Sequence, residues 1–280
     1  MLKLRVITAL ILFPLAVSGI LFLPKHYFAA LFGLVMLLGA YEWAGFAKFP
    51  SVLAKLAYVL MVAVILLSIW LLNFILPMNF MNGLAAVFWL FAFVLLVAYP
   101  KSASFWSGKI IIISIMGFFL LSIAWYAVVK IHEIEALQFA QTQISGPYLL
   151  LSSMMLIWAA DTGAYFSGKR FGKNKLAPKV SPGKSIEGVM GGLLLAVLIV
   201  ILFTAWHGGQ LQDYFNVIGI TLVTVIFSVI GDLMESMFKR QADIKDSGNI
   251  LPGHGGILDR IDSITAACPV FLIALSLVYL

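Results

Sequence analysis

Long apolar segments constrain this chain more than any other feature. Nine segments are long enough to cross about 30 Å of hydrocarbon, and they cover residues 6–23, 28–47, 52–72, 83–99, 109–130, 146–168, 186–207, 214–231 and 262–280. Hydrophobic residues make up 62% of the sequence and charged residues only 11%, a balance that leaves too few polar groups to cover a soluble domain. We therefore predict an all-α polytopic membrane protein with nine transmembrane helices.

The basic residues predict the orientation of these helices. If the N-terminus is cytoplasmic, 16 of the 18 Lys and Arg residues fall in cytoplasmic segments, and only Lys25 and Lys130 lie on the opposite side. The positive-inside rule thus favours a cytoplasmic N-terminus and a C-terminus on the other side. The first segment follows basic residues, as a signal peptide would, but no small-residue cleavage site precedes Pro24. We expect an uncleaved first helix.

Acidic residues divide the chain into two parts. Only three of them precede Asp161, whereas nine lie between Asp161 and Asp262. We expect residues 1–145 to form a transmembrane scaffold of five helices, and residues 146–280 to form a catalytic region of four helices with two polar cytoplasmic loops, 169–185 and 232–262. The single cysteine, Cys268, excludes a disulfide framework within the chain.

The first polar loop leads into the seventh apolar segment through Ser181, Lys184 and Glu187. Hydroxyl groups, free backbone N–H groups and an ammonium group would meet there at a helix N-terminus, which favours a phosphate. Alternatively, the serines are plain helix caps and the lysines only fix the topology. Asp161 lies inside the sixth segment, where a carboxylate is costly unless it is paired or solvated. It is a functional candidate, or a structural partner of Lys184.

The second polar loop carries pairs of carboxylates at helical spacing. Asp232 and Glu235 are three residues apart at the end of the eighth segment, and Asp259 and Asp262 repeat this spacing at the start of the ninth. Two such helix ends can converge on one divalent cation. Hard oxygen ligands, without a cysteine cluster or paired histidines, favour Mg²⁺, or alternatively Mn²⁺, over Zn²⁺.

A glycine-rich turn separates the two pairs. It contains His254, Gly255 and Gly256, so the backbone can approach a ligand closely and the imidazole can bind a phosphate oxygen. A glycine-rich turn is usually only a turn, and charge runs are usually solvated. Carboxylate pairs, fixed cations and such a turn between two membrane helices are together typical of phosphoryl or nucleotidyl transfer.

At these positions the sequence resembles the phosphatidate cytidylyltransferase (CDP-diglyceride synthase) family. The family pattern is met over some 27 positions by Ser236, Lys239, Arg240, Lys245, Asp246, Pro252, His254, Gly255, Gly256, Asp259, Arg260 and Asp262. The resemblance extends to Asp161 and to the stretch from Ser181 to Gly188, and it weakens in the N-terminal half.

The resemblance implies that the phosphate of phosphatidate attacks the α-phosphorus of CTP, giving CDP-diacylglycerol and pyrophosphate. The implied roles are metal binding by Asp232, Asp259 and Asp262; catalysis by Lys239, Arg240, Lys245, Asp246 and His254; and substrate binding by Asp161, Ser181, Lys184, Glu187, Gly255, Gly256 and Arg260. Arg260 is equally compatible with a structural pairing to Asp246 or Glu235. A second, monovalent cation at the site and a homodimer both stay open.

The expected partners are CTP, phosphatidate and membrane lipids, with no nucleic acid, and the expected location is a bacterial-type inner membrane with the site on its cytoplasmic face. Two rivals stay open. A CTP-dependent enzyme acting on another lipid, such as a polyprenol kinase or an isoprenoid-ether cytidylyltransferase, would share this site. An anion or lipid transporter is less compatible, because it would place its charges near the middle of the membrane.

Overall fold

The protein is a bundle of long helices with two short hairpins. The computed structural model describes residues 2–72 and 76–280, with the backbone alone described for residues 2–7 and 9. The helices are α1 (Leu2–Phe22), α2 (Lys25–Phe46), α3 (Val52–Leu72), α4 (Met78–Val97), α5 (Ala103–Trp106), α6 (Ile110–Glu133), α7 (Gly146–Phe171), α8 (Ile186–Trp206), α9 (Leu211–Gln241) and α10 (Leu258–Val278). The strands are β1 (Leu137–Phe139), β2 (Thr142–Ile144), β3 (Lys175–Ala177) and β4 (Ser181–Ser185).

Eight helices among the described residues are long and apolar enough to cross a membrane, namely α2, α3, α4, α6, α7, α8, α9 and α10. In α1 the described apolar segment is the shorter Leu10–Phe22. This confirms the predicted all-α polytopic class. The side chains of Lys3 and Arg5, which entered the prediction of orientation, lie outside the described residues.

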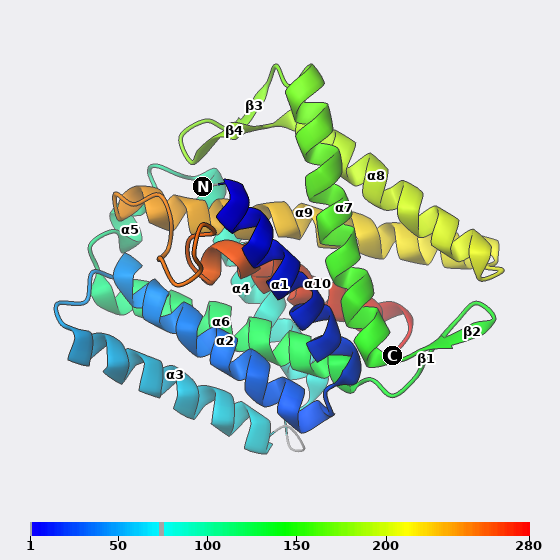
Figure 1. Cartoon of the computed structure of the whole chain (residues 1–280), viewed down its shortest axis with the longest axis horizontal. Helices are drawn as coiled ribbons and strands as arrows, with labels where there is room; N and C mark the ends of the chain where they lie inside the picture. The colour runs from blue at the N-terminus through cyan, green and yellow to red at the C-terminus, as the bar shows by residue number, and fades with distance from the viewer. Residues whose placement is uncertain (1, 73–75) are drawn as a thin grey trace.

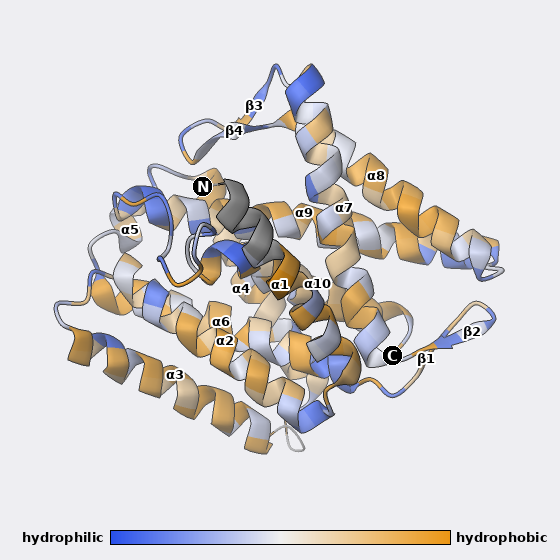
Figure 2. Cartoon of the chain, in the orientation of Figure 1, coloured by the Kyte–Doolittle hydropathy of each residue, from blue (hydrophilic) through white to orange (hydrophobic). Residues whose placement is uncertain are grey.

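The polar segments gather at one end of the bundle (Figure 1). The antiparallel β3–β4 hairpin, the end of α9 and the beginning of α10 lie at this end, whereas the antiparallel β1–β2 hairpin and the C-terminus lie at the other. Figure 2 shows hydrophilic residues concentrated at the β3–β4 hairpin and at the end of α9, with apolar residues along the helices. The two loops that were predicted to be polar therefore share one end of the molecule.

Aromatic side chains of α2 and α3 fasten these two helices to α6. The indole of Trp43 donates a 2.8 Å hydrogen bond to the Ile113 carbonyl, and the hydroxyl of Tyr58 donates one of 3.1 Å to the Ser114 carbonyl. Both rings lie against Gly117 of α6, where a Cβ would collide with the Trp43 and Tyr58 side chains. Because Trp43 is fully buried, the adjacent turn of α2 is held firmly against α6 and α9.

Glycines allow α7 and α8 to pack closely. A Cβ on Gly163 would lie 2.5 Å from the Gly191 carbonyl oxygen, and a Cβ on Gly192 would lie 2.5 Å from the Ala160 carbonyl oxygen. Small residues at such positions let helix backbones approach within a membrane, where direct packing drives their association. The close approach places the end of α7 beside the beginning of α8, and with it Asp161 beside the β3–β4 hairpin.

Candidate active site

The last turns of α9 carry a row of polar side chains. Glu235 and Lys239 are four residues apart on one face, and their Oε2 and Nζ atoms are 2.8 Å apart. One turn earlier, Ser236 donates a 3.3 Å hydrogen bond to Asp232 Oδ1. The predicted helical spacing of Asp232 and Glu235 is thus confirmed, and a neighbouring face of the same helix is apolar, through Met234 and other buried residues.

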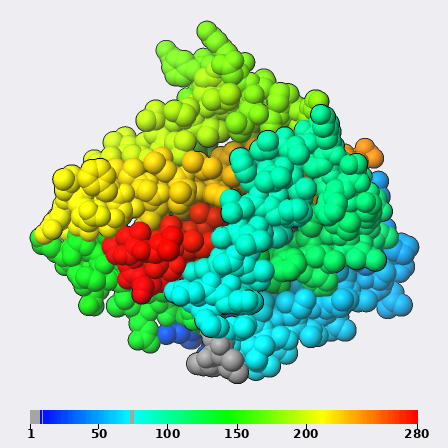
Figure 3. Space-filling model, turned by 180° about the vertical axis from the view of Figure 1, so that it is seen from behind, coloured from blue at the N-terminus to red at the C-terminus, as the bar shows by residue number. Residues whose placement is uncertain are grey.

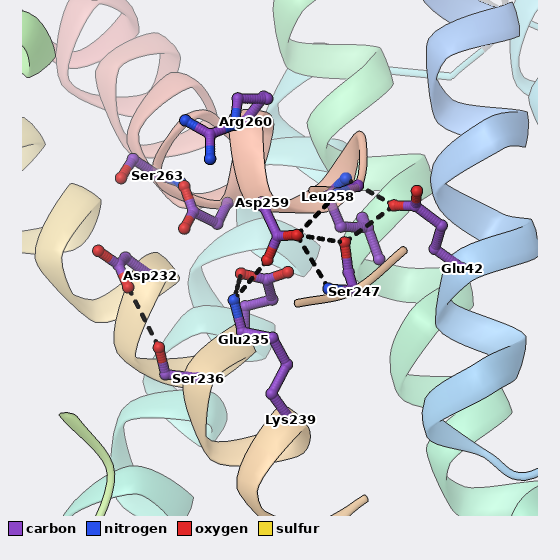
Figure 4. Close-up of polar contacts among 12 residues, drawn as sticks. Glu42, Asp232, Glu235, Ser236, Lys239, Ser247, Leu258, Asp259, Arg260 and Ser263 are labelled. Carbon is purple, nitrogen blue, oxygen red and sulfur yellow. Dashed lines mark hydrogen bonds and ion pairs between the residues drawn. The ribbon is translucent and has the colours of Figure 1, made fainter. Parts of the chain in front are cut away.

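Lys239 connects α9 to α10. Its ammonium group lies 2.6 Å from Asp259 Oδ1 as well as 2.8 Å from Glu235, and the side chains of Lys239 and Asp259 are only 10% and 7% exposed. Figure 4 shows Lys239 pointing between the two carboxylates. Because two carboxylates surround one buried ammonium, the two helix ends are held together by charge as well as by apolar packing.

The second oxygen of Asp259 also has protein partners. The backbone N–H groups of Ser247 and Gly256 donate to Oδ2 at 2.9 and 2.8 Å, and the Ser247 hydroxyl lies 3.0 Å from it. Both oxygens of Asp259 are therefore engaged with the chain itself. These contacts fold the loop between α9 and α10 onto the first turn of α10.

Glu42 of α2 reaches the same helix end from the N-terminal half of the chain. It is buried, accepts hydrogen bonds from the backbone N–H groups of Ile257 and Leu258 at 3.0 and 2.9 Å, and lies 3.0 Å from the Ser247 hydroxyl. The first N–H groups of a helix have no partner within it, and a carboxylate there also interacts favourably with the helix dipole. Glu42 thus caps α10 from another helix (Figure 4).

The β3–β4 hairpin brings a second lysine to α9. Lys184 Nζ lies 2.6 Å from Asp232 Oδ2, with both side chains about a quarter exposed. Arg240 Nε donates a 3.1 Å hydrogen bond to the Val180 carbonyl, which ties the hairpin to the end of α9. Ser185 caps α8, as one alternative expected, by accepting a 3.1 Å hydrogen bond from the Gly188 N–H.

Two further predicted residues belong to this hairpin region. Glu187 accepts hydrogen bonds from the backbone and side chain of Asn174, the latter at 2.7 Å, and so fixes the start of the hairpin. Ser181 lies in β4 opposite Ala177 and is half-buried. The structure brings Lys184 to the acidic cluster, whereas Glu187 contacts the hairpin itself.

Asp161 and Lys184 line one cavity of about 400 Å³ between α7, α8, α9 and β4. Lys184 forms its short ion pair with Asp232 rather than with Asp161. Asp161 therefore adds a negative group, and Lys169 at the end of α7 adds a second cation, to the wall of this cavity. An anionic ligand in it would meet lysines from two different elements.

The glycine-rich turn folds tightly over α10. Gly253 and Gly255 have φ angles of 76° and 81°, which favour glycine, and a Cβ on Gly255 would lie 2.7 Å from Asp259 Oδ2. Arg260 Nε donates a 3.1 Å hydrogen bond to the His254 carbonyl, in place of the predicted pairing with Asp246 or Glu235. Lys245 and Asp246 are exposed in the same loop.

The carboxylates of Asp232, Asp262 and Glu235 are the candidates for binding the predicted divalent cation. Asp262 accepts a 2.6 Å hydrogen bond from the Ser263 N–H at Oδ1 and interacts electrostatically with Asp232 and Glu235. Glu235 Oε1 is buried without a hydrogen-bond partner in the described part of the chain. Within that part, three or more acidic, histidine or cysteine groups do not converge on one point. Mg²⁺ commonly takes one or two carboxylates and completes its shell with water and substrate phosphates, and the donors at Asp232, Asp262 and Glu235 fit that chemistry.

Two residues of the site had no predicted role: Glu42 and Ser247. Glu235 was predicted as part of a carboxylate pair and as an alternative partner of Arg260, but not as the partner of Lys239. Glu42 had a usable signal, because it is the only acidic residue in the first 132 positions and lies within an apolar segment, where a carboxylate is costly. Ser247 had none, since its place between Glu42 and Asp259 depends on how the loop folds.

The site as a whole is an acidic cluster faced by lysines, in which Glu42 and Glu235 are buried and Asp161 is exposed. Carboxylates come from α2, α7, α9 and α10, while Lys184 and Lys239 come from the hairpin and from α9. Such a cluster holds its lysines in fixed positions. Together with a bound cation, these lysines can orient phosphate groups and stabilise the charge that develops when a phosphorus–oxygen bond breaks.

Comparisons with known proteins agree with this geometry. The model of the family described as "Cytidylyltransferase family" matches residues 3–278. A phosphatidate cytidylyltransferase of Pseudomonas aeruginosa is 45% identical over 271 residues, which cover 97% of this chain and 96% of that protein. The enzyme of the same name from Haemophilus influenzae is 40% identical over 97% of both chains. One from Staphylococcus aureus is 42% identical over 57% of this chain and 58% of its own length.

Proposed function

Because the chain belongs to the cytidylyltransferase family, we propose that it transfers CMP from CTP to phosphatidate, with CDP-diacylglycerol and pyrophosphate as the products. The observation that carries this proposal is the similarity over nearly the whole chain to two proteins named phosphatidate cytidylyltransferase. The acidic cluster with its two lysines supports it.

The reaction makes one bond and breaks another at the same phosphorus. A phosphate oxygen of phosphatidate bonds to the α-phosphorus of CTP, while the bond from that phosphorus to the bridging oxygen breaks and pyrophosphate leaves with the electron pair. The attacking phosphate is already an anion, so the protein does not have to remove a proton from it. Its main task is to hold two polyanions together in line.

The cations of the site are assigned to that task. Lys184 lines the cavity between α7, α8 and α9 and is assigned to the phosphate of phosphatidate. Ser181, in the same strand but not among the residues that line the cavity, keeps its predicted assignment to the same phosphate. Lys239, buried between Glu235 and Asp259, is assigned to the triphosphate. The exposed Lys245 and the half-buried His254 in the loop above are assigned to the leaving pyrophosphate. Arg240 supports the site by fastening the hairpin to α9.

A divalent cation, Mg²⁺ or Mn²⁺, is part of the proposal. Asp232 and Asp262 would hold it, with Glu235 Oε1, which has no hydrogen-bond partner among the described residues, nearby. When bound, the cation would neutralise phosphate oxygens. The metal-ligand role of Asp259 stays a prediction. Its contacts support a different role, which is to position Lys239 and the glycine-rich turn.

The protein is a multi-pass membrane protein with apolar helices and bacterial relatives. The proposed location is the inner membrane, with the site facing the cytoplasm. This location is supported by the positive-inside pattern and by the water-soluble nature of CTP, which has to reach the polar end of the bundle from the aqueous side.

A labelling experiment tests the reaction directly. Purified protein in detergent is incubated with phosphatidate, Mg²⁺ and CTP that carries ³²P in either the α or the γ position, and the label in the lipid fraction is counted. We expect α-label in the lipid, no γ-label, and loss of the signal when Mg²⁺ is removed with EDTA. ATP, GTP and UTP serve as controls for the nucleotide.

The pattern of labels also identifies the alternatives. Transfer of γ-label to a lipid would mean a CTP-dependent kinase and would contradict the proposal. α-Label that enters a polyprenyl or isoprenoid-ether phosphate but not phosphatidate would keep the nucleotidyl transfer and replace the lipid. No lipid label from folded protein under any condition would contradict the proposal as a whole.

A further inference from the structure

Two cavities meet beneath the β3–β4 hairpin. The first is the one of about 400 Å³ that contains Asp161 and Lys184. The second is a groove of about 580 Å³ between the end of α4, the hairpin and α9. Val189 of α8 and Val229 of α9 line both spaces. These two side chains border both spaces, so the two spaces adjoin at this point.

The two spaces differ in chemistry. The first carries the charged groups Asp161, Lys169 and Lys184. The second is lined by apolar side chains except at Tyr99 and Lys179. We define the acyl groove as the part of the second space that is lined by Phe93, Val97, Leu176, Val180, Ile226 and Ile230. A ligand that fills both spaces must have an anionic head and an apolar tail.

The acyl groove opens sideways rather than toward the polar end of the bundle. Val97, Phe93 and Ile226 are 69%, 43% and 42% exposed, and all three lie on helices that are apolar enough to cross a membrane. Figure 3 shows α4 (cyan) beside α9 (yellow) on this side of the molecule, with α8 and the hairpin (yellow-green) above them. In a bilayer these side chains face lipid tails, so a lipid can enter the groove without leaving the apolar phase.

The hairpin forms the roof of the acyl groove and is held in place by the site itself. Val180 is buried, and its carbonyl accepts the 3.1 Å hydrogen bond from Arg240. Four residues later, Lys184 forms the 2.6 Å ion pair with Asp232. The same short segment thus contributes an apolar wall to the groove and a cation to the polar cavity, which fixes the position of one relative to the other.

We propose that the acyl groove holds a fatty-acyl chain of phosphatidate while the phosphate of the same molecule lies in the polar cavity beside Lys184. The inference rests on the proposed function and adds to it the place of the lipid tail and its path from the membrane. The groove distinguishes phosphatidates by chain length, because every methylene group buried in it adds to the affinity for the lipid. The occupant is a lipid tail rather than a protein helix, because the groove adjoins the polar cavity that contains Lys184.

Filling the groove tests this inference. Val97→Trp places an indole in the groove from an exposed position of α4, where a large side chain costs little stability. Val94→Trp is the matched control, since Val94 is 60% exposed on the same helix and is not among the residues that line the groove. Turnover is measured with dioleoyl and with dihexanoyl phosphatidate, whose chains are too short to depend on the groove.

We expect Val97→Trp to lower kcat/KM for dioleoyl phosphatidate by about tenfold and to leave dihexanoyl phosphatidate within about twofold of wild type, because only the long chain loses contacts. Val94→Trp should behave as wild type with both lipids. Ile226→Trp, on the opposite wall, should reproduce the loss of the long-chain preference, with Val223→Trp of α9 as its control.

Several results would overturn the inference. These are an equal loss with both lipids, no loss with either variant that lines the groove, or the same loss in the Val94→Trp control. Wild-type protein that uses neither lipid would instead contradict the proposed function, so the two failures are distinct.

Cross-linking gives a second readout that does not depend on turnover. A phosphatidate with a diazirine near the end of one chain should label peptides containing residues 93–97 or 226–230, and excess unlabelled phosphatidate should compete. Label confined to the apolar cavity at the other end of the bundle, which Leu156, Ile220 and Tyr279 line, would place the chain elsewhere and overturn the inference.

Discussion

Carboxylates that lie close together at this site differ in their contacts and therefore in the roles open to them. Asp259 has both oxygens engaged, by Lys239, Ser247 and Gly256. Asp262 has one short backbone hydrogen bond, to Oδ1, and lies near the charges of Asp232 and Glu235. Neighbouring residues of one sequence motif therefore divide into a carboxylate that holds the protein together and one with capacity left for a cation.

This division predicts different effects when Asp262 or Asp259 is replaced by asparagine. Asp262→Asn should raise the Mg²⁺ concentration required for half-maximal turnover by tenfold or more, on the order of the loss seen when a metal-site carboxylate is altered. Asp259→Asn should leave that concentration nearly unchanged but lower the stability by about 1–3 kcal/mol, because buried donors lose an acceptor. Magnesium titration of activity and thermal unfolding of the purified variants measure the two effects. A raised Mg²⁺ requirement in Asp259→Asn would show that Asp259 binds the metal, as the sequence predicted.

Glu42 shows how a residue outside the recognisable motif can control it. Its two oxygens accept from Ile257 and Leu258 and lie beside Ser247, and Gly248 and Gly256 pack so closely that a Cβ on either would meet the carboxylate. The carboxylate of Glu42 on α2 thus positions the first turn of α10, which carries Asp259 and Asp262.

Glu42→Gln should lower stability by about 1–3 kcal/mol, because the amide nitrogen would face a backbone N–H donor instead of accepting from it. Activity should fall with it, since the start of α10 shifts, and Glu42→Ala should be worse than Glu42→Gln. Glu135→Gln is the matched control, because the side chain of Glu135 is 88% exposed in its ion pair with Lys25. Thermal unfolding and turnover of the three variants test this, and a Glu42→Gln protein as stable and active as wild type would contradict it.

At the level of elements, the sequence predicted nearly the whole fold. The nine predicted segments correspond in order to α1, α2, α3, α4, α6, α7, α8, α9 and α10, because burial in a bilayer is decided by local apolar character. The largest boundary difference is in α9, which continues to Gln241 rather than ending near residue 231. Its last turns carry charged residues on one face, among them Lys239, which pairs with Glu235 and Asp259, so a search for apolar segments ends before them.

The site was predictable to the extent that its residues are neighbours in sequence. The two carboxylate pairs, the glycine-rich turn and Lys184 could all be found from spacing and composition. The contacts of Glu42 with residues 247 and 257–258 span more than 200 positions, and one sequence carries no local signal for such a distance. For the same reason, the β3–β4 hairpin and its attachment through Arg240 and Val180 emerged only from the structure.

The packing of α7 on α8 carries a prediction of its own. Gly192→Ala would bring a methyl group to 2.5 Å from the Ala160 carbonyl oxygen, so the two helices must move apart. We expect a loss of about 1–3 kcal/mol, as for other overpacked sites, and a fall in turnover, because Asp161 lies on α7 and Lys184 lies in β4, which leads directly into α8. Gly219→Ala of α9, where a Cβ would meet nothing within 4 Å, should leave the melting temperature and turnover unchanged. A Gly192→Ala protein that melts and reacts like wild type would contradict the role of this close approach.

For the whole molecule, the decisive feature is which end faces the cytoplasm. The β3–β4 hairpin with its lysines and the β1–β2 hairpin lie at opposite ends of the bundle (Figure 1). Because 16 of the 18 basic residues belong to segments predicted to be cytoplasmic, the positive-inside rule predicts that the β3–β4 end faces the cytoplasm. CTP would then reach the acidic cluster directly, and phosphatidate would arrive from the adjoining leaflet through the acyl groove.

Cysteine labelling in spheroplasts tests this orientation. Cys268 is the only cysteine in the sequence and is buried, so Cys268→Ser gives a background for single new cysteines at Lys173, before β3, and at Gln143, in β2, both of which are exposed. A membrane-impermeant maleimide should label Gln143→Cys in intact spheroplasts and Lys173→Cys only after lysis. The reverse pattern would invert the orientation and place the site on the outer face, away from the nucleotide. Labelling of both positions from the same side would contradict the arrangement of the helices, because α7 lies between the two hairpins and must cross the membrane once.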